Sequence, residues 1–166
     1  MIDETRPRAI RRVIENRDEL RTSVVQVVGL ATRTLSILTR DLEPEIYGHD
    51  RFLEAVKHFV LARSFSRVRV LISEPTRTMR AGHRFVTLAR RLSSYIEFRH
   101  LGADFAPRAE AFLLADDTAL VYRADASRYE GLCGTWEPAA TRRHLDDFDA
   151  MWEGSEQSAE LRALRV

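Results

Sequence analysis

The sequence predicts an α/β domain in which helices cover both faces of a mixed β-sheet. Three observations support this fold class. Helical and strand periodicities alternate over the first 100 residues, which favours parallel strands joined by helices. Strand-like segments follow one another after residue 108, which favours antiparallel strands added to the same sheet. Finally, 166 residues with 45% apolar and 31% charged side chains can bury one core of ordinary size.

The first half of the chain carries a local signal for each expected element. Asn16 can cap a first helix, with Glu19 three residues later as its capping-box partner, and Asp50 can cap a second helix. Apolar residues recur at helical spacing after both caps. The expected elements are a flexible arm over 1–13, helices over 16–31 and from 50 to about 60, strands over 34–39 and 67–72, and a polar loop over 40–50.

The second half contains one more helix and strand before the consecutive strands. Pro138 occupies the favoured first turn of a final helix. The expected elements are a helix over 76–92, strands over 95–100, 109–115 and 118–122, a short strand within 127–136, and a helix from 138 to about 153. The domain is therefore expected to span residues 14–154, followed by a C-terminal tail over 155–166.

Composition narrows the function classes. Cys133 is the single cysteine, so an intrachain disulfide is excluded, and its small apolar setting indicates a buried side chain. The sequence contains no apolar run of about 20 residues and begins with a polar segment, so we expect a cytoplasmic protein with no membrane partner. The five histidines lack ligand spacing, so no metal and no cofactor is expected.

Positive charge concentrates in the middle of the chain. Residues 51–100 contain 11 basic and 3 acidic residues. At about 100° per residue, Arg77, Arg80, Arg84 and Arg91 fall within a wedge of about 60° on the helix over 76–92. Such a stripe suits phosphate-backbone binding. The alternative, which the sequence favours, is a solvated face paired with the acidic C-terminal helix.

A polar pocket is predicted where the parallel strands end. In such sheets ligands lie beyond the carboxyl ends of the strands. A pocket with both signs of charge would suit a small zwitterion or a peptide segment, and the equally supported alternative is ion pairs that only pin loops. The side chains expected there are Arg40, Asp41, Ser73, Glu74 and Arg128, with His100 at the end of a third strand.

Three segments resemble a known group. Residues 39–47, 83–94 and 111–117 resemble an uncharacterised proteobacterial domain family, and the resemblance covers roughly residues 15–155. Members of that family are similar in architecture to phospholipase D-like proteins, and some are joined to GNAT-type acetyltransferase domains. The resemblance implies that the chain is built like half of a phospholipase D, that it can form a homodimer, and that an acetyltransferase-type protein is a candidate partner.

The sequence departs from the catalytic motif of that enzyme group. Active members carry His-x-Lys-x4-Asp, in which the histidine attacks phosphorus and the lysine holds the phosphate oxygens. Aligning the motif on Asp117 places Glu110 at the histidine and Phe112 at the lysine. Aligning it on Asp116 places alanines at both positions. The histidine nucleophile and the lysine cation are missing in either register, so we expect a non-catalytic accessory or regulatory domain that binds a partner or an anionic ligand.

Two alternatives remain open on the sequence. One is a nucleic-acid-associated protein that uses the basic helix over 76–92. The other is an enzyme with a remodelled site formed by Glu110, Asp117, His100 and Arg123. The second alternative requires Glu110 and Asp117 to face one cavity. Paired acids at a strand bend are more often turn residues, which favours a structural role for Asp116 and Asp117.

Overall fold

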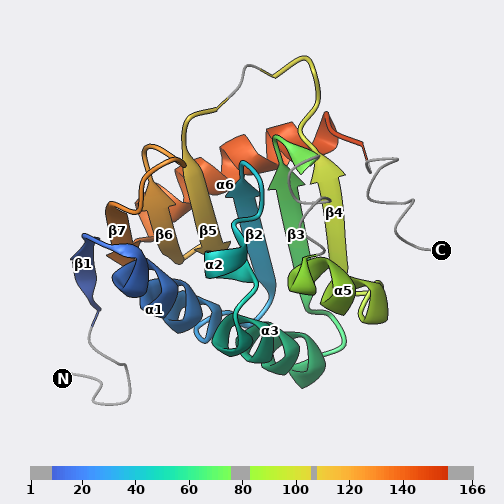
Figure 1. Ribbon diagram of the computed structural model, residues 1–166, viewed down its shortest axis with the longest axis horizontal. Helices are drawn as coiled ribbons and strands as arrows, with labels where there is room; N and C mark the ends of the chain where they lie inside the picture. The colour runs from blue at the N-terminus through green and yellow to red at the C-terminus, as the bar shows by residue number, and fades with distance from the viewer. Residues whose placement is uncertain (1–8, 76–82, 106–107, 157–166) are drawn as a thin grey trace.

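A computed structural model describes residues 9–75, 83–105 and 108–156, in which one seven-stranded sheet is flanked by helices (Figure 1). The strands are β1 (Arg11–Ile14), β2 (Thr34–Thr39), β3 (Arg67–Ile72), β4 (Ile96–His100), β5 (Ala111–Ala115), β6 (Ala119–Arg123) and β7 (Gly131–Gly134). The helices are α1 (Arg17–Val28), α2 (Pro44–Tyr47), α3 (Asp50–Ala62), α5 (Arg84–Arg91) and α6 (Pro138–Glu153).

The sheet is mixed, with the strand order β1-β7-β6-β5-β2-β3-β4. Strands β2, β3 and β4 are parallel, whereas β5, β6, β7 and β1 are added by antiparallel pairing. The parallel part contains the alternating helices and the antiparallel part contains the consecutive strands. The predicted fold class is therefore confirmed.

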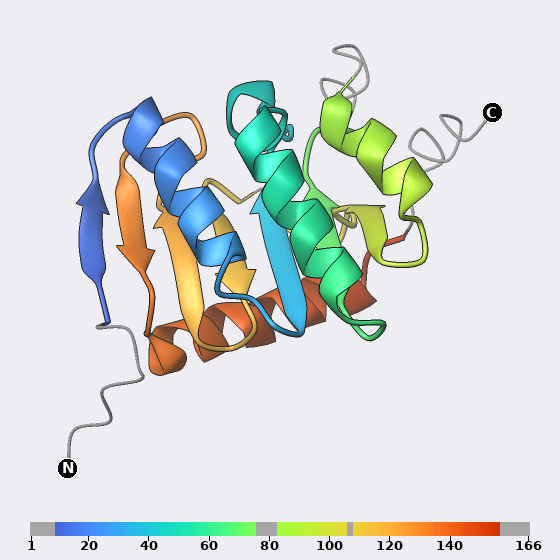
Figure 2. The same cartoon turned by 90° about the horizontal axis from the view of Figure 1, so that it is seen from below.

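Helices cover both faces of the sheet, as expected. Helices α1, α3 and α5 lie side by side on one face, and α6 crosses the other (Figures 1 and 2). Side chains that alternate along a strand point to opposite faces of the sheet. Leu35 and Ile37 of β2 belong to the core under α1 and α3, whereas Leu38 belongs to the core under α6. Phe112 and Phe148 anchor this second, smaller core.

The structure differs from the expected elements at the N-terminus. Residues 11–13, expected in a flexible arm, belong to β1, which pairs with β7 at the edge of the sheet. The strand is fixed by distant partners: Arg11 bonds Glu137, and Arg12 bonds Ser23 and Gln26. Four residues held by such contacts carry no periodicity that sequence reading can detect. The expected arm over residues 1–8 lies outside the described residues.

Two further local differences affect the region after β2. The short helix α2 lies inside the segment expected to be a loop. Asp50 was expected to cap α3, but the N-cap is His49 and no side chain caps this helix. Asp50 instead pairs with Arg84 of α5. Asn16 does cap α1, accepting a hydrogen bond from the Glu19 amide at 2.9 Å.

The C-terminal end of the described chain is held against β4. Ser155 is buried and its Oγ accepts a hydrogen bond from the Gly102 amide at 2.9 Å, while the His100 amide donates to the Glu156 carbonyl. The first two residues of the expected tail are therefore part of the domain, and the rest lie outside the described residues. Across the described ranges, no helix is both long enough and apolar enough to span a bilayer.

Candidate functional site

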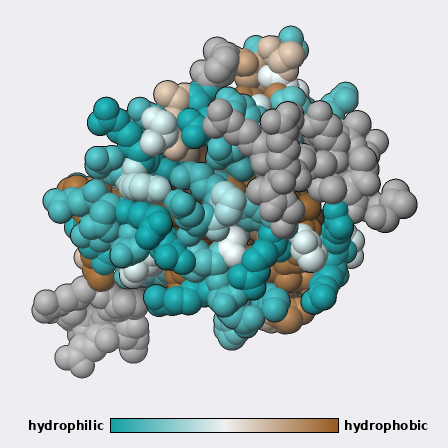
Figure 3. All heavy atoms as spheres, in the orientation of Figure 1, coloured by the Kyte–Doolittle hydropathy of each residue, from teal (hydrophilic) through white to brown (hydrophobic). Residues whose placement is uncertain are grey.

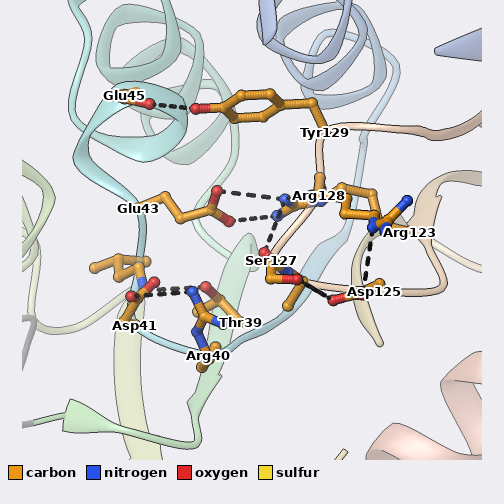
Figure 4. Close-up of polar contacts among 12 residues, drawn as sticks. Thr39, Arg40, Asp41, Glu43, Glu45, Arg123, Asp125, Ser127, Arg128 and Tyr129 are labelled. Atoms are coloured by element: carbon orange, nitrogen blue, oxygen red, sulfur yellow. Dashed lines mark hydrogen bonds and ion pairs between the residues drawn. The ribbon is translucent and has the colours of Figure 1, made fainter. Parts of the chain in front are cut away.

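The candidate site lies at the edge of the sheet where β2, β3 and β6 end, which is called the carboxyl edge below. Charged side chains from the segment after β2 and from the loop between β6 and β7 meet there (Figure 4). The carboxyl-edge cluster consists of Thr39, Arg40, Asp41, Glu43, Glu45, Arg123, Asp125, Ser127, Arg128 and Tyr129.

Arg123 is the buried centre of this cluster. Its side chain is 3% exposed and forms a two-pronged ion pair with Glu43, which is 18% exposed. The same guanidinium donates to the Arg128 carbonyl at 2.9 Å and to the Ala126 carbonyl. Arg123 therefore ties the segment after β2 to the β6–β7 loop. Tyr47 lies beside it, and burial raises the pKa of the Tyr47 phenol to about 12.

The turn after β2 is backbone-strained. Leu42 is fully buried and has a φ of 55°, a left-handed conformation that costs a non-glycine residue about 1–2 kcal/mol. The Thr39 hydroxyl stabilises the turn by accepting a hydrogen bond from the Leu42 amide at 3.0 Å. This geometry places Asp41 and Glu43 on either side of a buried anchor. Strain of this kind concentrates at ligand sites, which supports the choice of this edge.

Four of the predicted pocket residues are brought together beside this turn. The Glu74 amide donates to the Arg40 carbonyl at 2.7 Å, and the Ser73 amide donates to the end of β2. Arg40 and Asp41 approach each other to 3.7 Å, and the Arg40 side chain is 34% exposed. Arg40 Nε is buried without a hydrogen-bond partner. The structure thus brings the backbones of Arg40, Asp41, Ser73 and Glu74 to the same edge of the sheet, and a ligand pocket formed by their side chains stays a prediction.

The β6–β7 loop completes the cluster. Asp125 accepts hydrogen bonds from the Ser127 hydroxyl and amide, and these bonds lower the pKa of the Asp125 carboxyl. Arg128 is 71% exposed and lies 3.8 Å from Asp125. The Tyr129 hydroxyl donates to Glu45 of α2 at 2.8 Å. The exposed part of the cluster therefore presents charges of both signs.

His83, one of the histidines that lack ligand spacing in the sequence, is a buried neighbour of this edge. It is 5% exposed and caps α5, because its Nδ1 accepts a hydrogen bond from the Phe85 amide at 3.0 Å. Burial lowers the pKa of the imidazole, and the Leu42 carbonyl and the Asp41 carboxylate oppose that shift. A neutral histidine therefore lies between the start of α5 and the turn after β2, with its Nε2 buried and without a hydrogen-bond partner.

Glu110 lies on the other side of the sheet from Arg123. Its two oxygens accept hydrogen bonds from Arg108 and from the Tyr122 hydroxyl, both at 2.9 Å. Arg108 also pairs with Asp147 of α6, so this network faces α6. Arg123, opposite Ala111 in the β5–β6 register, faces α2. The sheet itself therefore separates Glu110 from Arg123.

The remodelled enzyme site proposed from the sequence is not assembled. Asp117 lies in the turn at the other end of β5 from Glu110, and the five residues of β5 separate them by roughly 16 Å. Asp117 bonds Arg142 at the surface. His100 is exposed on β4, three strand spacings or roughly 14 Å from β5. The expectation that Glu110 and Asp117 face one cavity is wrong, because opposite ends of a strand do not meet.

Asp116 has the structural role that the turn prediction favoured. It adopts a φ of 53° and accepts hydrogen bonds from the amides of Thr32, Arg33 and Thr34. Its carboxylate thereby fixes the loop that leads into β2. Cys133 is fully buried, and burial raises the pKa of its thiol, which makes it a poor nucleophile.

The arginine stripe is only partly described. Arg77 and Arg80 lie outside the described residues, whereas Arg84 and Arg91 belong to α5 and line a hollow against α3. Arg84 pairs with Asp50 and donates to the Gly48 carbonyl at 3.2 Å. The expected pairing with α6 is therefore replaced, at Arg84, by pairing with α3. The same hollow contains Glu54, so it does not present a purely basic surface.

Sequence reasoning missed the residues that organise the cluster. Glu43 and Glu45 lay in the expected loop, and their roles depend on partners about 80 residues away. The Pro44 signal for a helix start beside Glu43 could have indicated α2. The Asp-x-Ser spacing of Asp125 and Ser127 could have indicated their turn. In the described ranges, no three His, Cys, Asp or Glu side chains cluster in a way that could hold a metal ion.

Comparisons with known proteins agree on the fold. A family model described as "Domain of unknown function (DUF7931)" matches residues 16–164. No curated protein matches the chain by sequence. Among solved structures, the phospholipase D family member Nuc from Salmonella typhimurium has a TM-score of 0.65 at 13% identity, over 91% of this chain and 99% of that one.

Two further structures extend the comparison. NucT from Helicobacter pylori has a TM-score of 0.61 at 12% identity, over 91% of this chain and 100% of that one. TrmBL2, an archaeal chromatin protein described as showing a novel mode of DNA binding, has a TM-score of 0.60 at 12% identity. That match covers 95% of this chain and 57% of TrmBL2. At these identities the likeness establishes a phospholipase D-like fold and nothing more.

Proposed function

The chain belongs to the DUF7931 family, and we propose that it is a non-catalytic phospholipase D-like module that binds a partner in an accessory or regulatory role. The observation that carries the proposal is that the positions of the catalytic histidine and lysine hold other residues. In one register Glu110 is committed to Arg108 and Tyr122, and Phe112 is 2% exposed in the core under α6. In the other register both positions are alanine.

The buried ion pair at the carboxyl edge supports the same proposal. Arg123 is the one guanidinium of the carboxyl-edge cluster that is deeply buried, and Glu43 occupies its two-pronged face. An incoming phosphate would have to displace a carboxylate of this chain. The remainder of the cluster, with the exposed Arg128 and Asp125 and the less exposed Arg40 and Asp41, suits a ligand that carries both charges. We infer that a peptide segment of a partner protein binds there.

Two partners are proposed for this module. The sequence resemblance to a proteobacterial family with acetyltransferase-joined members supports an acetyltransferase-type protein as a partner. The resemblance to half of a phospholipase D supports a second copy of this chain as another. The single, buried Cys133 is compatible with a cytoplasmic module.

Nucleic-acid binding is the second candidate function. TrmBL2, which matches 95% of this chain, is described as a DNA-binding chromatin protein, and this neighbour is the observation that favours it. Arg91, which is exposed on α5, and Arg84, which is 60% exposed, would be the described contacts. The carboxylates of Asp50 and Glu54 in the same hollow oppose it.

One titration tests both candidates. The isotope-labelled chain is titrated with a mixed-charge peptide containing Lys and Asp, and separately with a 16-nucleotide DNA strand, while backbone amide shifts are recorded. We expect the peptide to move the amides of Arg40, Asp41 and Arg128, and we expect the doubly substituted variant Arg40→Ser with Arg128→Ser to weaken binding at least tenfold.

The DNA arm decides the alternative. Binding that moves α5 amides, weakens steeply between 50 and 200 mM salt, and is lost in Arg84→Glu with Arg91→Glu would support nucleic-acid binding and overturn the first proposal. A peptide response that persists unchanged in the Arg40 and Arg128 variant would also overturn it. The matched control is Arg142→Ser, which removes a surface ion pair at the opposite edge.

A further inference from the structure

A polar hollow lies outside the carboxyl-edge cluster, between the first turns of α1 and α3. It has a volume of about 220 Å³ and is lined by Asp18, Arg21, Thr22, His49 and Arg51. Figure 2 shows α1 and α3 running side by side from the same edge, and Figure 3 shows a largely hydrophilic surface over them. The volume is below that of sites for drug-sized ligands, so the hollow suits one chemical group.

The two arginines of this hollow have no anionic partner. Over the described ranges, Arg21, which is half-buried, and Arg51, which is exposed, make neither an ion pair nor a side-chain hydrogen bond. The carboxylates nearby are engaged with other cations. Asp18, which lines the hollow and is mostly exposed, lies 3.8 Å from Arg17, and Asp50 pairs with Arg84. Two guanidinium groups therefore face one hollow with their donors unused.

His49 adds a third unused donor. Its Nε2 is buried and has no hydrogen-bond partner, although the residue stands at the N-cap of α3. Burial, together with the charges of Arg21 and Arg51, lowers the pKa of the imidazole, while Asp50 opposes the shift. The ring is therefore near both guanidiniums and is neutral at pH 7. A neutral imidazole can still donate one hydrogen bond from Nε2.

The N-terminus of α3 also favours an anion in this hollow. The 13-residue helix α3 has no side-chain cap, so amides of its first turn remain available. The positive end of the helix dipole points toward this edge. Thr22 supplies a hydroxyl from α1. Fork-shaped guanidiniums, a ring N–H and a hydroxyl around one small hollow match the oxygens of a tetrahedral oxyanion.

We infer that Arg21, Thr22, His49 and Arg51 bind the phosphate group of a phosphate monoester in this hollow, whose lining also includes Asp18. Two unpaired guanidiniums favour a dianion over the single charge of a diester. The hollow holds the phosphate alone, and the remainder of the ester extends into solvent. This site is separate from the carboxyl-edge cluster, so it stands whether or not that cluster binds a peptide.

Histidine NMR tests the inference on the full chain. The His49 ring signals are followed while the protein is titrated with inorganic phosphate, phosphoserine or dimethyl phosphate. We expect saturable shifts with inorganic phosphate and with phosphoserine, and at least tenfold weaker binding of dimethyl phosphate. A bound anion should also raise the measured pKa of His49, because it stabilises the protonated ring.

Paired variants make the result specific. Arg21→Gln with Arg51→Gln should weaken phosphate binding at least tenfold, whereas Arg63→Gln, at the exposed opposite end of α3, should leave it unchanged. The inference is overturned if His49 shifts fail to saturate, if Arg63→Gln weakens binding equally, or if dimethyl phosphate or a DNA strand binds as tightly as phosphoserine. A backbone amide spectrum that matches the wild-type spectrum outside the substituted region would confirm that each variant is folded.

Discussion

Replacing Phe112 with lysine is expected to abolish the cooperative unfolding transition of the domain. Phe112 is 2% exposed on the α6 face of β5, with its ring 6.3 Å from that of Phe148 and 5.3 Å from that of His144. Losing a buried phenyl group costs about 3–5 kcal/mol. Burying an ammonium, or deprotonating it, adds to that cost. The sum approaches the whole stability of a typical domain, about 5–15 kcal/mol.

Thermal and urea unfolding followed by circular dichroism measure this effect. The control is Phe112→Leu, which keeps an apolar side chain and should cost less than about 1.5 kcal/mol with some repacking. A lysine variant with a wild-type midpoint would show that position 112 is not committed to the core. The prediction matters for function, because lysine at this position is what the phospholipase D motif requires in the Asp117 register.

Breaking the buried ion pair at the carboxyl edge is expected to have the second largest effect. Arg123→Ala leaves the carboxylate of Glu43 in a site where it is 18% exposed and has lost its partner. It also removes the donors of the Ala126 and Arg128 carbonyls. Removing one partner of a buried pair costs about 3–5 kcal/mol, and we expect a loss in that range by urea unfolding.

A second pair in the same protein provides the matched control. Arg11 and Glu137 also form a two-pronged ion pair, and Glu137 is 19% exposed, but the Arg11 side chain is 67% exposed whereas that of Arg123 is 3% exposed. Arg11→Ala should therefore cost clearly less than Arg123→Ala, because the lost guanidinium lies mostly in water and donates to no backbone carbonyl. The double variant Arg123→Met with Glu43→Leu should recover most of the loss, since both charges are gone. Equal losses for Arg123→Ala and Arg11→Ala would refute the burial argument.

The fold was accessible from the sequence where its signals are local. The segments at β2 and β3 are recognisable because they are rich in β-branched and apolar residues, most of which are buried, and the apolar stripe of α3 is periodic because one face of that helix is buried. By contrast, β1 has four residues and takes its conformation from β7, more than 115 residues away. The short helix α2 could not be predicted for a similar reason, since four residues are too few to show a helical period.

The candidate site was partly accessible for geometric reasons. Parallel strands end at one edge, so Arg40 and Glu74 could be placed together from strand boundaries alone. The sequence could not show that Glu43 is the partner of Arg123, because the two residues are 80 positions apart. The enzyme alternative fails because Glu110 and Asp117 flank opposite ends of β5. Residues at opposite ends of one strand do not share a cavity.

A hydrolysis assay tests the central proposal most directly. Purified wild-type chain and the Glu110→Gln variant are incubated with bis(p-nitrophenyl) phosphate, and nitrophenolate release is followed against a matched blank. The account predicts no release above the blank from either protein, because the residues at 110 and 112 offer no nucleophile or cation to a phosphoryl group. Release that scales with wild-type concentration and disappears in Glu110→Gln would contradict it.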